Sequence, residues 1–332
     1  MNKMFLRLIG TVAVLGLVGC AANDAFYAAS SRSDVFVQEY DDTRFDFLWV
    51  LDNSGSMAPR REFVKDNMQG FLNILNSRKA VDFQMAVTTT DMFTHAGALV
   101  EGPGGLKVVK SATSADPVAD FASIVDAVSD SATSFWEQGL ESAYQSVSLY
   151  SNQFSRSGVP LIIIFVTDED DYSCQDHCWG SQPETNPDDV EYATSRYIDY
   201  FKGFKASQNS TTYVFPIVGL DTSSCVVSSL GSRYEEVQVG VGGLSRSGSI
   251  CNAELRDSYE SIAQIISDRG MVFPLSAAAS GNGIVVSVDG VLIPFSPENY
   301  VYDSEENAIV FTGVIPRSGA IIEVSYLQGT AN

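Results

Sequence analysis

An apolar run gives way to a short polar loop in the stretch Trp49-Val50-Leu51-Asp52-Asn53-Ser54-Gly55-Ser56-Met57. The run from Phe45 to Leu51 predicts a strand. The loop is followed by apolar residues at helical spacing, namely Val64, Met68, Phe71, Leu72 and Leu75. The loop thus places one carboxylate and two hydroxyls at the carboxyl end of a strand, where open α/β sheets bind ligands. Three hard oxygens on one loop suit a hard divalent cation such as Mg²⁺.

Two later loops carry similar side chains. The run from Leu161 to Val166 is apolar without alternation, which predicts a strand covered on both faces. Thr167-Asp168 follows it directly. A helix is predicted from Trp136 to Tyr150, and the loop before it contains Thr133-Ser134. These two hydroxyls can cap that helix or act as ligands, and the sequence leaves both readings open.

In this order, the three loops resemble the metal-ion-dependent adhesion site of the von Willebrand factor A (VWA) family. The resemblance covers roughly residues 44 to 270. The chain departs from the family pattern at Ser134, where the family has Thr, and at Glu169, where it commonly has Gly. The resemblance implies the ligands Asp52, Ser54, Ser56, Ser134 and Asp168, with Thr133 as the alternative to Ser134 and Asp91 as a weaker candidate that holds a bound water.

The resemblance also implies a function. In the VWA family such a site holds Mg²⁺, or Mn²⁺ or Ca²⁺, and a protein partner supplies an acidic residue to the metal. We therefore expect a metal-dependent binding protein. The alternative is a cell-envelope scaffold in which the metal site is incidental and a disulfide-closed flap or a β module makes the contacts. An enzyme is not expected, because no general base is positioned near the motifs and the chain has only two histidines.

The first residues predict export. Lys3 and Arg7 precede an apolar stretch from Leu8 to Val18, as in a signal peptide. Leu17-Val18-Gly19-Cys20 resembles a bacterial lipobox, which implies lipidation of Cys20 and attachment to a membrane. The residue after Cys20 is Ala21 and not Asp. In this respect the chain resembles lipoproteins that are sorted to the outer membrane of a Gram-negative bacterium. An ordinary secretory signal is the alternative.

Four cysteines remain after Cys20 is set aside. Export implies an oxidising compartment, and proximity in the sequence favours the disulfides Cys174–Cys178 and Cys225–Cys251. A metal site at Cys174-Gln-Asp-His177-Cys178 is the alternative to the first of these. The connectivity therefore stays open.

The expected domain organisation follows from these patterns. From Val272 onward the chain consists of short strands with turn signals, including Asp289-Gly290, a strong hairpin signal. We expect a signal peptide at 1–19, a flexible tether at 20–43, a VWA domain at 44–270 and a small β module at 271–332. The expected fold class is α/β, with a doubly wound, mainly parallel sheet followed by the small all-β C-terminal module.

The charge of the chain limits its partners. Asp and Glu outnumber Lys and Arg by 41 to 20 in 332 residues, which gives a net charge of −21. Nucleic acids and anionic lipid headgroups require a basic face, so neither is expected as a partner.

Overall fold

The central strands of the larger sheet are buried along almost their whole length. In β2 (Arg44–Leu51) every residue after the first is buried, and in β5 (Leu161–Val166) all residues are buried. The computed structural model describes residues 31–38, 44–76, 81–130, 136–174, 191–208, 210–221, 225–242, 247–251, 257–259, 262, 272–313, 316–317 and 319–329.

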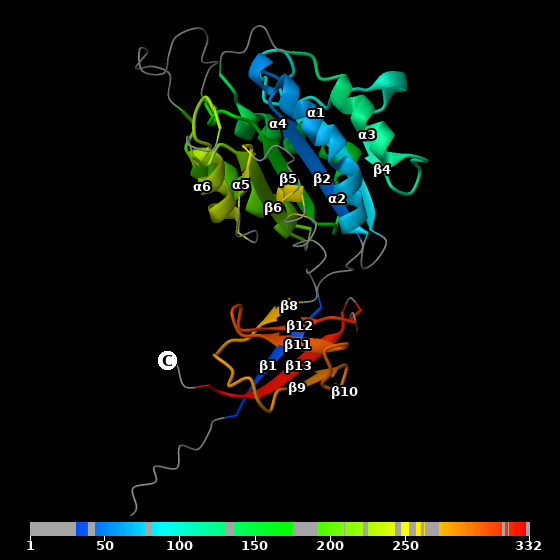
Figure 1. Cartoon of the computed structure of the whole chain (residues 1–332), viewed down its shortest axis with the longest axis vertical. Helices are drawn as coiled ribbons and strands as arrows, with labels where there is room; N and C mark the ends of the chain where they lie inside the picture. Colours follow the sequence, from blue (N-terminus) through cyan, green and yellow to red (C-terminus); the bar gives the residue numbers. More distant parts are fainter. Residues whose placement is uncertain are drawn as a thin grey trace, which may run out of the picture.

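Six strands form the larger sheet, in the order β4-β3-β2-β5-β6-β7 (Figure 1). Its other members are β3 (Asp82–Thr89), β4 (Val108–Lys110), β6 (Thr212–Val218) and β7 (Gly248–Ser249). The register aligns Leu48 with Ala86 on one side and with Ile163 on the other. Strands β2, β3, β5, β6 and β7 are parallel, whereas β4 runs antiparallel to β3.

A hydrophobic core lies on each face of this sheet, because alternate residues of a strand point to opposite faces. Phe47, Trp49 and Leu51 belong to one core, which includes residues of α1 (Ala58–Asp66), α2 (Met68–Leu75) and α3 (Pro117–Asp126). Leu48 and Val50 belong to the other. That second core includes residues of α4 (Gly139–Phe154), α5 (Thr194–Ala206) and α6 (Ser232–Val241). Short 3-10 helices lie at Gly55–Met57 (η1) and Pro103–Gly105 (η2).

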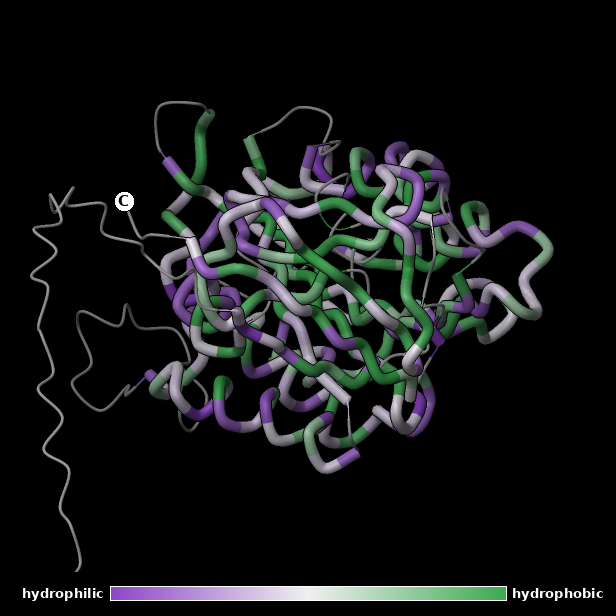
Figure 2. Tube along the Cα trace, turned by 90° about the horizontal axis from the view of Figure 1, so that it is seen from below, coloured by the Kyte–Doolittle hydropathy of each residue, from purple (hydrophilic) through white to green (hydrophobic). Residues whose placement is uncertain are grey.

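Two smaller antiparallel sheets form a separate β part (Figure 1). One contains β1 (Ser31–Val37), β13 (Ile321–Leu327), β9 (Val285–Val288) and β10 (Val291–Ile293). The other contains β11 (Tyr300–Asp303), β12 (Ala308–Phe311) and β8 (Val272–Pro274). Their facing residues, among them Phe273, Phe311 and Val324, form a third core. Figure 2 shows hydrophobic residues (green) concentrated in the central segments of the molecule.

The predicted fold class is wrong. Six of the ten strand pairings that the structure describes are antiparallel, and the strands divide among three sheets, so the chain is not built on one mainly parallel, doubly wound sheet. Five of the six antiparallel pairings lie in the β part and the sixth joins β4 to β3, so the parallel arrangement is confined to β2, β3, β5, β6 and β7.

The β part is also not a C-terminal appendage. Strand β1 lies within the predicted tether, yet it pairs with β13 along its whole length, from Ser31 opposite Leu327 to Val37 opposite Ile321. Asp34 accepts hydrogen bonds from the backbone N–H of Ser276 at 2.8 Å and from the hydroxyl of Tyr326 at 2.8 Å. The α/β part is therefore inserted between the first strand of the β part and its remaining strands.

Candidate functional site

The candidate site lies where the order of the strands reverses. The chain adds β3 and β4 on one side of β2, and then β5, β6 and β7 on the other side. The carboxyl ends of β2 and β5 are therefore neighbours, and Leu51 aligns with Val166. Open sheets bind ligands outside the carboxyl ends of their strands at such a point. Asp52 follows β2 here, and Thr167-Asp168 follows β5.

Asp52 is fully buried and is fixed by both neighbouring loops. Its Oδ1 accepts a hydrogen bond from the backbone N–H of Ser54 at 2.7 Å, and its Oδ2 accepts one from the Thr167 hydroxyl at 2.7 Å. Burial raises the pKa of Asp52. The bonds from Thr167 and Ser54 oppose that shift, while the nearby Asp168 carboxylate adds to it.

Ser54, Ser56 and Asp168 lie next to one another at this edge of the sheet. The hydroxyls of Ser54 and Ser56 lie 3.0 Å apart, and the Ser56 hydroxyl donates to Oδ1 of Asp168 at 3.1 Å. Asp168 is 3% exposed, whereas Ser56 is exposed. The carboxylates of Asp52 and Asp168 are thus buried, whereas Ser56 places a hydroxyl at the surface.

Arg60 completes this group, and the sequence analysis missed it. It lies in the first turn of α1, and its Nη1 donates to Oδ2 of Asp168 at 2.5 Å. Its Nη2 donates to the backbone carbonyl of Val226 at 2.9 Å. The only signal in the sequence was the position of Arg60, four residues after Ser56 and at the start of the predicted helical segment.

The prediction of Mg²⁺, Mn²⁺ or Ca²⁺ as a cofactor is corrected by this geometry. Among the residues that the structure describes, no group of three or more His, Cys, Asp or Glu side chains could hold a metal ion. The carboxylate of Asp168 is paired with the guanidinium of Arg60, and that positive charge would repel a divalent cation at the same place. The site residues that the structure describes therefore do not fit a metal.

Of the remaining predicted ligands, only Asp91 is among the described residues. Ser134 and its alternative Thr133 lie outside the described residues. Asp91 caps its own loop, because its Oδ1 accepts the backbone N–H groups of Phe93 at 2.8 Å and of Thr94 at 2.9 Å.

A further buried carboxyl group that the sequence analysis missed, that of Glu137, lies close enough to Asp52 to feel its charge. Glu137 precedes α4, is 1% exposed and shares a hydrogen bond with the Thr90 hydroxyl. Burial, together with the negative charge of Asp52, raises the pKa of Glu137 to about 9. Glu137 therefore carries a proton at neutral pH. Because it is not part of a linear motif, only the fold could show its position.

A disulfide-closed segment, residues 225–229, contacts the loop that carries Asp168. Cys225 and Cys251 are bonded, with their Cα atoms 5.3 Å apart, which confirms that predicted pair. The backbone N–H groups of Ser228 and Ser229 donate to the carbonyl of Asp168 at 2.9 Å and 3.2 Å. The segment from 225 to 229 is therefore attached to the loop that carries Asp168.

Of the other cysteines that the sequence predicted to be modified or bonded, the structure describes only Cys174. Cys174 is disulfide-bonded. Its predicted partner Cys178 and the lipidation candidate Cys20 lie outside the described residues. Among the described residues, no helix is long and apolar enough to cross a membrane.

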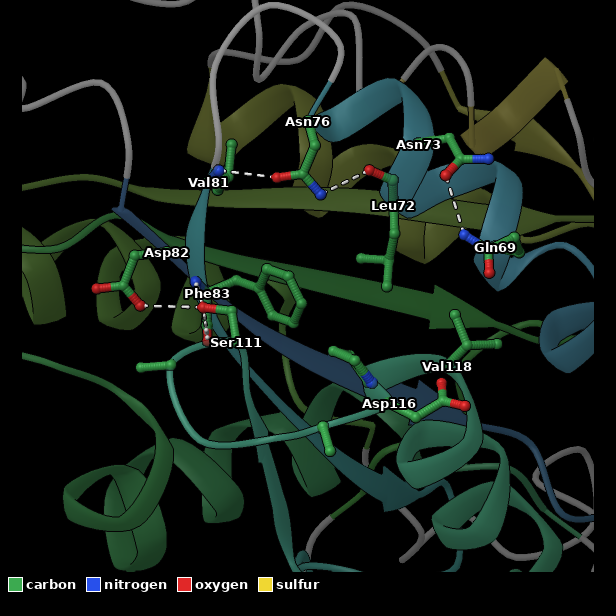
Figure 3. A pocket seen from close by; sticks show the side chains of 13 residues that line it. Gln69, Leu72, Asn73, Asn76, Val81, Asp82, Phe83, Ser111, Asp116 and Val118 are labelled. Atoms are coloured by element: carbon green, nitrogen blue, oxygen red, sulfur yellow. Dashed lines mark hydrogen bonds between the residues drawn. The ribbon is translucent and has the colours of Figure 1, made fainter.

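A separate pocket of about 660 Å³ lies at the amino end of β3. It is lined by residues of α2, the start of β3, the loop after β4 and the start of α3 (Figure 3). Its polar side chains bond within the lining: Asn76 accepts from Val81, Gln69 donates to Asn73, and Ser111 donates to Asp82. The pocket is therefore a less suitable binding site than the carboxyl edge of the sheet.

No family model matches the chain, and no curated protein matches it. Among solved structures, it is similar to the open form of the pilus adhesin SpaC from Lactobacillus rhamnosus GG, with 12% identity and a TM-score of 0.45. That match covers 87% of this chain and 39% of the adhesin.

Two further structures are similar at the same level. The pilus adhesin RrgA from Streptococcus pneumoniae has 11% identity and a TM-score of 0.33, with 89% of this chain and 58% of that chain covered. Proximal thread matrix protein 1 from the mussel byssus has 12% identity and a TM-score of 0.36, with 70% and 48% covered. The chain thus spans between 39% and 58% of these three structures. The similarities are too low to assign a function.

Proposed function

We propose that this chain is an exported, lipid-anchored binding protein that recognises a protein partner at the carboxyl edge of its larger sheet, without a metal ion. One observation carries the proposal. The loop after β2, the loop after β5, the first turn of α1 and the disulfide-closed segment converge at the point where the strand order reverses.

The surface around this point suits a protein partner. Val226, whose backbone carbonyl accepts from Arg60, is 89% exposed, and Phe93, in the loop after β3, is 51% exposed. The exposed hydroxyl of Ser56 lies in the neighbouring loop. Apolar side chains beside hydrogen-bonding groups are the usual composition of a protein–protein interface.

Charge constrains the chemistry of this partner. The net charge of −21 favours a partner with a basic contact surface, since complementary charge speeds association and excludes other partners. The predicted acidic residue of the partner was inferred as a ligand for a metal, and it has no role at a site that does not fit one.

The lipid anchor is part of the proposal through the lipobox at Leu17 to Cys20. The chain from Cys20 to Ser31 reaches at most about 40 Å. An acylated Cys20 would therefore hold the β part close to an outer membrane, and the α/β part would carry the recognition site.

Site-specific photo-cross-linking tests the proposal. A cross-linking residue at Val226 reports on the proposed site, and one at Val239 on α6 is the matched control, since it is 80% exposed. We expect the full-length protein in its native envelope to give a discrete cross-linked partner from position 226 in the presence of EDTA. A partner captured only from position 239 would contradict the proposal.

The scaffold alternative is favoured by a different observation. Leu292 and Phe295, in and after the edge strand β10, are 67% and 69% exposed. If the β part makes the main contacts in the envelope, a cross-linker at Leu292 would capture a partner, and Val226 would capture none.

A further inference from the structure

Arg60 connects three segments that are distant in the sequence. Its side chain extends from α1 to the carboxylate of Asp168 after β5 and to the carbonyl of Val226 in the disulfide-closed segment. Its Nη2 also lies 3.8 Å from Sγ of Cys225. Both members of the ion pair are largely buried, with side-chain exposures of 16% for Arg60 and 4% for Asp168.

The contacts leave little room for a second cation. Oδ2 of Asp168 accepts from Arg60, and Oδ1 accepts from the Ser56 hydroxyl at 3.1 Å. Oδ1 and Oδ2 of Asp52 accept from Ser54 and Thr167. All four carboxylate oxygens of the two acids therefore have donors within the chain. A buried carboxylate without a counter-charge is costly, so Asp168 needs a cation, and Arg60 supplies it.

The disulfide-closed segment fixes the position of this arginine. Val226 is adjacent to Cys225, and its carbonyl accepts from Arg60. The next residues, Ser228 and Ser229, donate their backbone N–H groups to the carbonyl of Asp168. One short segment therefore contacts both members of the ion pair, and the disulfide to Cys251 holds the start of that segment in place.

We propose that Arg60 is the resident cation of this site, in the place where a metal would otherwise lie, and that the segment closed by Cys225–Cys251 holds it against Asp168. The site is then preformed and independent of divalent metals. Its integrity depends on the redox state of one disulfide.

Thermal unfolding of the full mature chain tests the first half of the proposal, with Mg²⁺ and Mn²⁺ as probes. We expect the wild-type midpoint to be the same in Mg²⁺, Mn²⁺ and EDTA. Arg60→Gln and Asp168→Asn should each lower the midpoint, and the double variant should lose less than the sum of the two. Lys107→Gln, which removes an exposed ion pair with Glu101, is the control and should change little.

Two results would overturn this half. The first is a rise of the wild-type midpoint with metal that Asp52→Asn abolishes. The second is strict additivity of Arg60→Gln and Asp168→Asn. If Arg60→Gln does not fold, Arg60→Lys replaces it in the same cycle, because the lysine keeps the charge but cannot reach two acceptors with a planar fork.

Hydrogen exchange tests the second half. The amides of Ser228 and Ser229 should exchange faster in Cys225→Ser/Cys251→Ser and in Arg60→Gln than in the wild type. The combined variant should exchange no faster than the more affected of the two, since both changes release the same segment. Unchanged exchange in Cys225→Ser/Cys251→Ser would refute a holding role for the disulfide. The partner does not enter either test, so the outcome is independent of the proposed function.

Discussion

The hydroxyl of Thr167 donates to Oδ2 of Asp52 across the carboxyl ends of two adjacent parallel strands, at 2.7 Å and with both residues fully buried. This bond joins the loops after β5 and β2. It also satisfies an oxygen that has no access to water. Thr167 therefore has a structural role at the floor of the site.

Replacing Thr167 tests that role. Thr167→Val removes the donor and keeps the shape, so Asp52 loses a hydrogen bond in a buried place. We expect the free energy of unfolding to fall by about 1–3 kcal/mol, measured by urea denaturation. Thr167→Ser keeps the hydroxyl and should lose less. Equal losses in the two variants would show that the hydroxyl does not contribute.

The raised pKa of Glu137 predicts that the free energy of unfolding depends on pH. Its pKa is about 9 in the folded protein against 4.5 for an ordinary Glu. Between these values the folded state binds a proton that the unfolded state has released, so this group's contribution to stability falls as the pH rises. Glu137→Gln has no proton to lose. We expect it to be more stable than the wild type at about pH 8, with a difference that shrinks toward about pH 5.

Denaturation curves across this pH range measure the effect. Glu101→Gln, at an exposed position, is the control and should follow the wild type throughout. A constant offset between Glu137→Gln and the wild type at every pH would contradict the assigned proton.

Arg156 forms an ion-pair cluster at the opposite end of the sheet. Its backbone N–H and Nε donate to the two carboxylate oxygens of Asp46 at 2.6 Å and 2.8 Å, and its Nη1 donates to Asp82 at 2.7 Å. The Asp46 side chain is fully buried. Arg156→Gln should therefore cost about 3–5 kcal/mol, because it removes the ion-pair partner of a buried carboxylate. Arg317→Gln, at an exposed pair with Asp289, should change stability little in the same denaturation assay. Similar losses from both variants would contradict this account.

The pairing of β1 with β13 predicts how removal of the N-terminal residues affects the stability of the β part. A chain beginning at residue 44 lacks the whole of β1, which leaves β13 as an edge strand and removes Phe36 from the core of the β part. We expect calorimetry to show that the unfolding transition of the β part is lost or shifted to lower temperature. A chain beginning at residue 31 should keep this transition. Identical transitions in the two chains would show that β1 is dispensable.

Local signals in the sequence predicted several elements well. The apolar runs that became β2 and β5 were correctly placed, as was the Asp289-Gly290 turn, where both residues have positive φ and join β9 to β10. Asp116-Pro117 is a local helix-start signal of the same kind, and the Asp116 side chain caps α3 through the N–H of Ala119. Each of these signals is contained in a few consecutive residues.

Features that depend on distant parts of the chain were missed. Strand β1 is rich in polar residues and is stabilised by pairing with β13, which lies almost three hundred residues later. Helix α6 has no clear local signal, because Gly and Ser around it obscure the buried spacing of Tyr234, Val237 and Val241. Four of the predicted site residues did converge. The prediction of a metal failed, because only the fold brings Arg60 to Asp168.

A crystal structure of the full mature chain grown in Mn²⁺ tests the central claim most directly, since anomalous scattering locates the metal without ambiguity. We predict that the guanidinium of Arg60 lies on the carboxylate of Asp168 and that no anomalous peak lies within reach of Asp52, Ser54 or Ser56. A manganese ion bound to these residues, with Arg60 displaced from Asp168, would contradict the account.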